Sequence, residues 1–173
     1  MGEVPNILVP TLSQKLTLPE FEKRYGGEKP YYEFWRGEAL QKAMPNWIHG
    51  LLQRILMDLL TRAGYKSAAE VQLKIDPDLQ LIPDVIATRD RIEESYPSRA
   101  LEVVIEVLSD SDPMSKTLAK CRAYHRWGFA QIYVVDPDAR TLFRWEANRL
   151  MEVEAFAGMR SQEIWEMLDR QLE

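Results

Sequence analysis

The pattern of apolar and polar positions is most regular between Pro45 and Arg62, where apolar residues recur at three- and four-residue steps. This period predicts an amphipathic helix, and Gly64 follows it as a stop signal. Three more helices are predicted from capping residues and glycine stops. They cover residues 18–25, a segment that runs from a cap at 109–113 to about Trp127, and residues 161–172.

Short runs of aromatic and aliphatic residues between turn signals indicate strands. Two of them lie in the aromatic segment 31–36 and in 39–44, and they turn at Gly37-Glu38. Further strands are expected at residues 65–75, 81–87, 100–108, 130–135, 141–146 and 150–156. The strand, helix, strand passage from 100 to 135 predicts one parallel crossover, while the other strands look hairpin-connected.

Together these elements predict a mixed α/β domain. Pro5 and Pro10 lie in a stretch with no clear period, so residues 1–16 are expected to be an irregular lead-in. Residues 17–173 are expected to form a single domain, because a chain of 173 residues needs only one hydrophobic core.

Composition narrows the function classes. Cys121 is the only cysteine of the sequence, which excludes an intrachain disulfide and a cysteine-cluster zinc site. No secretory leader and no apolar run of about 20 residues is present, so we expect a cytoplasmic protein without a membrane partner. The net charge of −5 argues against a nonspecific polyanion binder, so a nucleic-acid role would need a local basic face or a metal.

Two acidic residues within apolar runs are the strongest candidates for chemistry. Glu106 interrupts the strand-like run 101–109, and Asp84 follows Pro83 in another run 22 residues earlier. Adjacent strands would bring the two carboxylates together, and such a pair suits Mg²⁺. The alternative for Asp84 is a turn residue after proline. The alternatives for Glu106 are an arginine partner, Arg99 or Arg126, and a position on an edge strand with one solvated face.

The helix after Glu106 carries Lys116, Lys120 and Tyr124 at four-residue spacing, so they share one face. A lysine there could hold an attacking water or neutralise charge that develops on a phosphate. Leu118 and Cys121 lie off this stripe and favour the alternative that it faces solvent. His49 lies at the margin of the apolar stripe of the 45–62 helix, where it is either a catalytic or a merely packed residue.

Several short motifs follow one another in a distinctive order. They are Trp35-Arg36-Gly37-Glu38, Pro45 to His49, Pro83-Asp84-Val85, Ile105 to Ser109, Lys120 to Tyr124 and Gly128 to Pro137. This order resembles the Uma2 family, also called DUF820, over about residues 17–155. The family comprises restriction-endonuclease-like proteins of the PD-(D/E)XK nuclease superfamily and is abundant in cyanobacteria. The resemblance implies a restriction-endonuclease-like core, with a mixed central sheet flanked by helices and a Mg²⁺ site at one sheet edge.

The resemblance also implies roles for individual residues. Asp84 matches the Pro-Asp acid of the family and Glu106 its Glu-Val-Leu-Ser acid, so both would be ligands of Mg²⁺, with Mn²⁺ as a substitute. In the wider superfamily a lysine stands two residues after the second acid, and here that position is Leu108. The lysine role would move to Lys120, which stands four residues before Tyr124, and Tyr124 and His49 would support the site.

Two further positions concern the acidic shell. Glu38 matches the Gly-Glu acid near the first hairpin, which helps to hold metal in related nucleases. Family members commonly carry an aspartate four residues before the helix lysine, and here that position is Lys116. Asp110 or Asp112 would have to substitute for it.

The leading expectation is therefore a Mg²⁺-dependent endodeoxyribonuclease that uses Asp84, Glu106, Lys120 and Glu38 and acts on DNA. A homodimer is expected, because cutting both strands of a duplex usually needs two active sites related by symmetry. The alternatives are a catalytically inactive nuclease-fold module for binding or assembly, and a structural α/β domain in which Glu106 merely pairs with an arginine.

Overall fold

The computed structural model describes residues 15–173, so the expectation of an irregular lead-in falls almost entirely outside the described residues. The helices of this part are α1 (Leu18–Tyr25), α2 (Trp47–Arg62), α3 (Met114–Trp127) and α4 (Gln162–Leu172). Helices α1, α2 and α4 lie within two residues of the predicted bounds, and α3 begins directly after its predicted capping segment and ends at Trp127 as predicted. No helix among residues 15–173 is long and apolar enough to cross a membrane.

The strands form two main sheets and a small ribbon. Their bounds are β1 (Tyr32–Trp35), β2 (Glu38–Gln41), β3 (Lys66–Ala69), β4 (Leu73–Asp76), β5 (Leu79–Leu81), β6 (Val85–Thr88), β7 (Val103–Val107), β8 (Gln131–Asp136), β9 (Thr141–Glu146), β10 (Arg149–Glu152), β11 (Ala155–Phe156) and β12 (Met159–Arg160). The larger sheet has the order β10-β9-β8-β7-β6-β3, the smaller β2-β1-β5-β4, and β11 pairs with β12.

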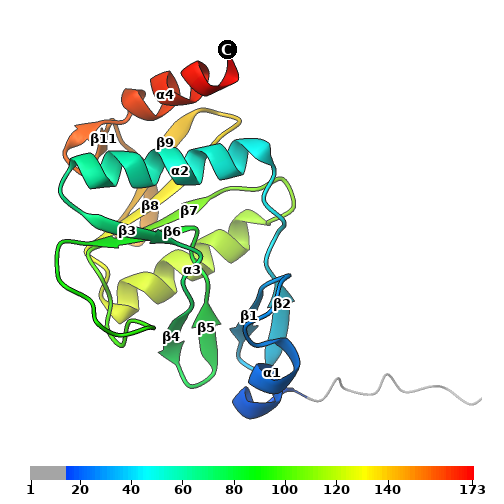
Figure 1. Ribbon diagram of the computed structural model, residues 1–173. Coiled ribbons are helices and arrows are strands. Elements are labelled where there is room, and N and C mark those ends of the chain that lie inside the picture. The colour runs from blue at the N-terminus through cyan, green and yellow to red at the C-terminus, as the bar shows by residue number, and fades with distance from the viewer. Residues whose placement is uncertain (1–14) are drawn as a thin grey trace, which may run out of the picture.

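The larger sheet is mixed, as predicted. Strands β7 and β8 are parallel and are joined by α3, whereas the other neighbours in this sheet are antiparallel. Figure 1 shows α2 and α4 on one side of this sheet and α3 on the other. The predicted parallel crossover between residues 100 and 135 is therefore confirmed.

Strand β7 shows how the sheet divides the core into two layers. Val103, Ile105 and Val107 pack with α2 and α4, while Val104 packs with the α3 side. Because successive side chains of a strand point to opposite faces, Glu106 belongs to the α3 side together with Val104. The strand is buried on both faces, so the carboxylate of Glu106 has to find its partners inside the protein.

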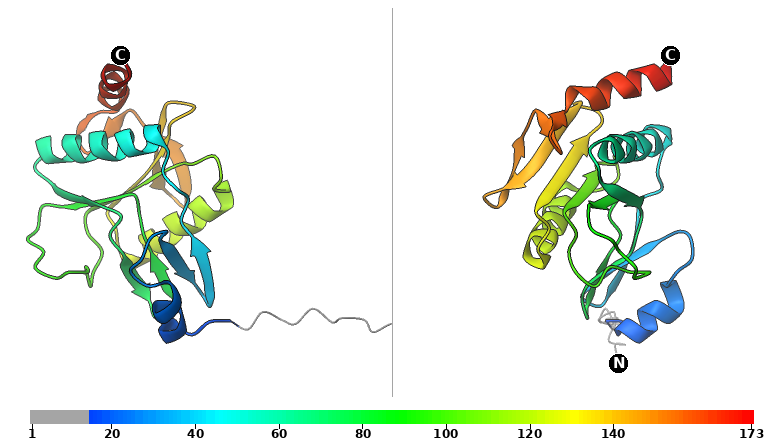
Figure 2. Two further views of the ribbon diagram at one scale, coloured as in Figure 1. Left: turned by 45° about the vertical axis from the view of Figure 1, so that its right-hand side comes forward. Right: turned by 60° about the vertical axis from the view of Figure 1, so that its left-hand side comes forward.

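The smaller sheet lies beyond α3, at the end of the molecule opposite α4 (Figure 2). Leu73, Leu79 and Leu81 of its strands belong to the same core cluster as Tyr124 of α3. Helix α1 covers β1, where the rings of Phe21 and Phe34 stack with centroids 4.8 Å apart. A capping box at Thr17 begins α1. Gly26 ends the helix, as the glycine stop signal predicts.

Three single-strand predictions are wrong. Residues 65–75 divide into β3 and β4, and residues 81–87 contain the end of β5 and most of β6, in each case in different sheets. Pro83 separates β5 from β6 because it has no N–H for the ladder, and Glu70, with φ of +55°, lies in the turn after β3. Residues 150–156 likewise divide between β10 and β11.

Candidate active site

Asp84 and Glu106 meet on the α3 side of the larger sheet. Strands β6 and β7 are antiparallel with Val85 opposite Ile105, so the next position along the register places Asp84 opposite Glu106. Both acids line one small, polar pocket together with Lys42, His49 and Lys120. The expectation that adjacent strands bring the two acids together is confirmed.

Asp84 is almost completely buried and uses both carboxylate oxygens. Oδ2 accepts the backbone N–H of Val107 at 2.7 Å, and Oδ1 lies 2.5 Å from the ammonium nitrogen of Lys42. The imidazole Nε2 of His49 is 3.2 Å from the same Oδ1. Burial alone would raise the pKa of Asp84, but the Lys42 ammonium and the His49 imidazole hold it well below its usual range. Asp84 is therefore an anion throughout the neutral pH range.

Glu106 accepts two contacts on one oxygen, Oε1. Tyr124 on α3 donates its hydroxyl at 2.5 Å, and the ammonium of Lys120, one turn earlier on α3, lies at 2.8 Å. Burial raises the pKa of Glu106 in spite of the Lys120 ammonium, and the negative charge of Asp84 adds to the increase. The partner of Glu106 is thus a lysine, and not Arg99, whose guanidinium pairs with Asp90.

Lys120 is buried and bridges two carboxylates. Its ammonium nitrogen is 2.8 Å from Glu106 Oε1 and 2.8 Å from Glu33 Oε1. Burial would lower its pKa, but Glu106, Glu33 and Asp84 outweigh this effect and raise the pKa above that of an ordinary lysine. Lys120 is therefore held as an ammonium between the two carboxylates.

The stripe on α3 faces the protein interior at Lys120 and Tyr124. Cys121 is buried as well, so the interior face of the helix is wider than the predicted stripe. Lys116, one turn before Lys120, is partly exposed and lies 3.2 Å from Asp112 and 3.8 Å from Glu33. The burial of Lys120 and Tyr124 contradicts the alternative that the whole stripe faces solvent.

Glu33 is the acid that sequence reasoning missed. It lies in β1 with no exposed surface, accepts the backbone N–H of Ile82 at 2.9 Å and also contacts Lys120. Burial opposes its ionisation, but Lys120 holds the pKa of Glu33 below the ordinary value. The same signal that marks Glu106, a carboxylate within an apolar run, is present in the aromatic segment 31–35 and could have identified Glu33.

Glu38 lies elsewhere, so the expectation that it completes the acidic shell has no support in the geometry. It is exposed at the first position of β2, opposite Trp35, and does not line the pocket of Asp84 and Glu106. Glu38 directly follows the turn residue Gly37, whose φ is +96°, and its side chain is exposed there. Five positions earlier in the same hairpin, Glu33 supplies the acid that reaches Lys120.

Of the other residues expected to support the site, His49 and Asp112 line the pocket and Asp110 does not. His49 lies in the first turn of α2, whose N-cap Asn46 accepts the backbone N–H of His49 at 2.9 Å, and its ring reaches the pocket. Asp112 lines the pocket and pairs with Lys116, whereas Asp110 lines a different hollow near the end of α4. Of the two proposed substitutes for the family aspartate, Asp112 is the one at the site.

The donor groups of the pocket fit a divalent cation in kind. Mg²⁺ prefers carboxylate oxygens and keeps several waters, and Asp84 and Glu106 present such oxygens next to each other. The Lys42 ammonium, held by Asp84 Oδ1 and by the carbonyl oxygen of Ile82 at 2.9 Å, marks a position where a cation is stabilised. Among residues 15–173 no group of three or more histidine, cysteine, aspartate or glutamate side chains is arranged to hold a metal.

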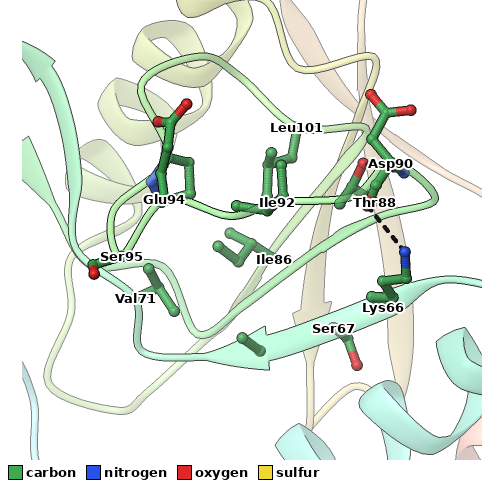
Figure 3. Close-up of a pocket in the computed structure, with 12 residues that line it drawn as sticks. Lys66, Ser67, Val71, Ile86, Thr88, Asp90, Ile92, Glu94, Ser95 and Leu101 are labelled. Atoms are coloured by element: carbon green, nitrogen blue, oxygen red, sulfur yellow. Dashed lines mark hydrogen bonds between the residues drawn. The ribbon is translucent and has the colours of Figure 1, made fainter.

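A larger hollow of about 270 Å³ lies away from these acids, between β3, β6 and the loop that carries residues 90–97 (Figure 3). Its lining combines aliphatic side chains, among them Val71, Ile86 and Ile92, with six polar or charged ones: Lys66, Ser67, Thr88, Asp90, Glu94 and Ser95. The ammonium of Lys66 donates to the carbonyl oxygen of Asp90 at its rim. Its charged side chains, Lys66, Asp90 and Glu94, are exposed, whereas Asp84 and Glu106 are buried.

The mixed sheet, the crossover helix and the buried acids beside a lysine define a protein of the restriction-endonuclease-like α/β class. The chain belongs to the Uma2 family: the family model, described as "Putative restriction endonuclease", matches residues 18–171. The resemblance predicted from the motif order is confirmed.

A solved structure supports the fold. A protein from Anabaena variabilis ATCC 29413, described as a putative nuclease belonging to DUF820, superposes with a TM-score of 0.73. The two sequences are 19% identical, and the match covers 88% of this chain and 99% of the other. A comparison with curated proteins gives no match.

Proposed function

We propose that this protein is a divalent-metal-dependent endodeoxyribonuclease that hydrolyses DNA phosphodiester bonds, with Mg²⁺ as the ion and Mn²⁺ as a substitute. The observation that carries the proposal is the meeting of Asp84, Glu106 and the buried cation Lys120 in one pocket. The family description supports nuclease activity in general.

In this proposal Asp84 and Glu106 hold the ion through their carboxylates. The bound ion would stabilise negative charge on the scissile phosphate and favour ionisation of the attacking water. Lys120 presents a charged ammonium, which would orient the water and balance charge on the phosphate. Glu33 and Tyr124 act as positioning residues, because Glu33 fixes Lys120 and Tyr124 fixes Glu106.

The polyanionic substrate meets an acidic protein, so binding must depend on local cations. Lys116 and Lys120 line the pocket and supply positive charge where the phosphate would lie. A homodimer, which would place two such pockets on the two strands of a duplex, remains part of the proposal. A cytoplasmic location stays a prediction.

The experiment is cleavage of supercoiled plasmid DNA by purified protein with Mg²⁺, with Mn²⁺ and with a chelator. Asp84→Asn should lower the cleavage rate about 100-fold or more, because an ionic ligand of the ion is lost. Asp58→Asn, on the exposed face of α2, is the matched control and should cleave like the wild type. Cleavage that continues in chelator, or that survives in Asp84→Asn, would contradict the mechanism.

One observation favours a second candidate, an inactive nuclease-fold module for binding or assembly. Each buried carboxylate of the site already has a lysine partner: Asp84 has Lys42, and Glu33 and Glu106 share Lys120. A site balanced in this way has less need of a metal. Calorimetric titration with Mg²⁺ and Mn²⁺ separates the candidates, since the inactive module would bind neither ion at millimolar concentration.

A further inference from the structure

Lys42 lies at the site although no motif points to it. It directly follows β2, and its backbone N–H donates to the carbonyl oxygen of Tyr31 at 2.8 Å, which ties this position to the β1–β2 hairpin. Its side chain is 11% exposed and ends at Asp84 Oδ1 and the carbonyl oxygen of Ile82. The ammonium therefore has two oxygen partners in the pocket.

The pairing of charges makes Lys42 the counter-ion of Asp84. Lys120 is already shared by Glu33 and Glu106, whose oxygens both lie 2.8 Å from its nitrogen. Asp84 is nearly as buried as these acids, and a buried carboxylate without a partner is costly. Lys42 at 2.5 Å meets this need when no metal is bound.

The same contact opposes the binding of a divalent ion. A metal ion on Asp84 would come within a few ångströms of the ammonium that already contacts Oδ1, and like charges repel strongly in a buried site. The ion and the ammonium therefore compete for one carboxylate. Binding of the ion requires the Lys42 side chain to leave.

The structure provides a place for the displaced side chain. Lys42 also lines a neighbouring hollow of about 320 Å³, on the side of the β1–β2 hairpin. Glu70, a half-buried carboxylate, lines this hollow as well and offers an acceptor for the ammonium. The long, flexible stem of a lysine can turn from one space to the other while its backbone stays fixed.

We propose that Lys42 is a tethered counter-ion that occupies Asp84 in the metal-free protein, withdraws into the neighbouring hollow when a divalent ion binds, and thereby weakens the affinity for that ion. This inference rests on the proposed function, because it takes Asp84 as a metal ligand. It assigns to Lys42 a role in setting the affinity of Asp84 for a divalent ion.

The test compares Lys42→Met, Lys42→Gln and the wild-type protein in two measurements. Calorimetric titration with Mn²⁺ and with Mg²⁺ gives the affinity for each ion, and thermal unfolding with and without ion gives the melting temperatures. Lys42→Met should unfold at a lower temperature without ion and should bind Mn²⁺ about tenfold tighter or more. Its melting temperature should also rise more on addition of Mn²⁺ than that of the wild type. Lys42→Gln removes the charge but keeps a polar side chain, and it should also bind Mn²⁺ more tightly than the wild type. This variant provides the test if Lys42→Met does not fold.

Lys66→Met is the control, because Lys66 is an exposed lysine at the hollow between β3, β6 and the loop 90–97. It should change neither the Mn²⁺ affinity nor the rise in melting temperature on addition of Mn²⁺. Equal or weaker Mn²⁺ binding by the Lys42 variants would overturn the role of Lys42 and leave the proposed function standing. Binding by the Lys42 variants but not by the wild type would support the counter-ion and contradict the proposed function. No binding by any of the proteins would overturn both.

Discussion

Helices α2 and α3 cover opposite faces of the same sheet, yet they bury very different side chains. The buried positions of α2 are mostly leucine and isoleucine: Leu51, Leu52, Ile55, Leu56, Leu59 and Leu60, beside His49 and Gln53. Those of α3 are small or polar: Thr117, Lys120, Cys121, Ala123 and Tyr124. One face of the sheet is closed by apolar area, and the other contains a network of charges.

Stability and chemistry depend on different faces of this sheet. Burial of leucine side chains on the α2 face lowers the free energy of the folded state without any need for exact partners. On the α3 face, Lys120 must be matched by Glu33 and Glu106, because the desolvation of each charge is unfavourable. We therefore expect the α2 face to stabilise the fold and the α3 face to depend on complete pairing.

The largest expected effect comes from breaking the network at its centre. Lys120→Met should lower the free energy of unfolding by about 3–5 kcal/mol, because it removes the ammonium that lies closest to the buried carboxylates of Glu33 and Glu106. Denaturant unfolding at neutral pH measures the change. The matched control is Lys116→Met, one turn earlier on α3, which should cost less than about 1 kcal/mol because its main contact, to Asp112, is partly exposed.

Removing all three charges of the network together tests whether charge pairing decides the stability of the α3 face. The triple variant with Lys120→Met, Glu33→Gln and Glu106→Gln should recover much of the stability that Lys120→Met loses, since no buried ion is then left unpaired. A triple variant less stable than Lys120→Met alone would mean that packing, and not charge, decides the α3 face.

A somewhat smaller effect is expected on the apolar face. Leu56 of α2 is completely buried, and Leu56→Ala should lower the free energy of unfolding by about 2–5 kcal/mol through lost burial and a cavity. Mn²⁺ binding by the folded protein should not change, which calorimetry can check. Leu172→Ala, at the exposed end of α4, is the control and should stay within about 0.5 kcal/mol of the wild type.

The smallest effect concerns Cys121, which reports how tightly the α3 face is closed. Burial raises the pKa of its thiol to about 12, and the nearby charge of Glu106 acts in the same direction. The folded protein therefore holds this thiol protonated at about pH 8, where an exposed cysteine is partly ionised and reactive. A thiol reagent should modify Cys121 only after denaturation, and rapid modification of the native protein would show that α3 opens locally.

The sequence predicts best what depends on local pattern. The three- and four-residue period of the 45–62 segment is confirmed by α2, because one face of that helix packs against the sheet. Asp84 and Glu106 could be identified as well, since a carboxylate in an apolar run must find a partner wherever the run is buried. The family resemblance then added Lys120 and Tyr124, which the periodic pattern alone left undecided.

The features that the sequence does not predict depend on which segments become neighbours in the fold. The assignment of 65–75 and 81–87 to single strands fails because each segment is shared between two sheets, and no local signal tells which strand pairs with which. Lys42 looks like an ordinary surface lysine in Gln41-Lys42-Ala43, and only the crossing from β5 to β6 brings Asp84 to it. Glu38 was expected for its motif, whereas the side chain that reaches the site is Glu33.

The residues of the site are far apart in the sequence, so the site forms only after distant segments of the chain have come together. The contact of Lys42 with Asp84 spans 42 positions and that of Glu33 with Ile82 spans 49. Contacts of this separation carry a cost in loop-closure entropy and tend to slow folding. Because Lys120 lies on α3, the charge network cannot be completed on the ribosome until most of the chain has been made. In a growing chain Glu33 and Asp84 would be solvated, and they would become buried only when α3 packs against the sheet.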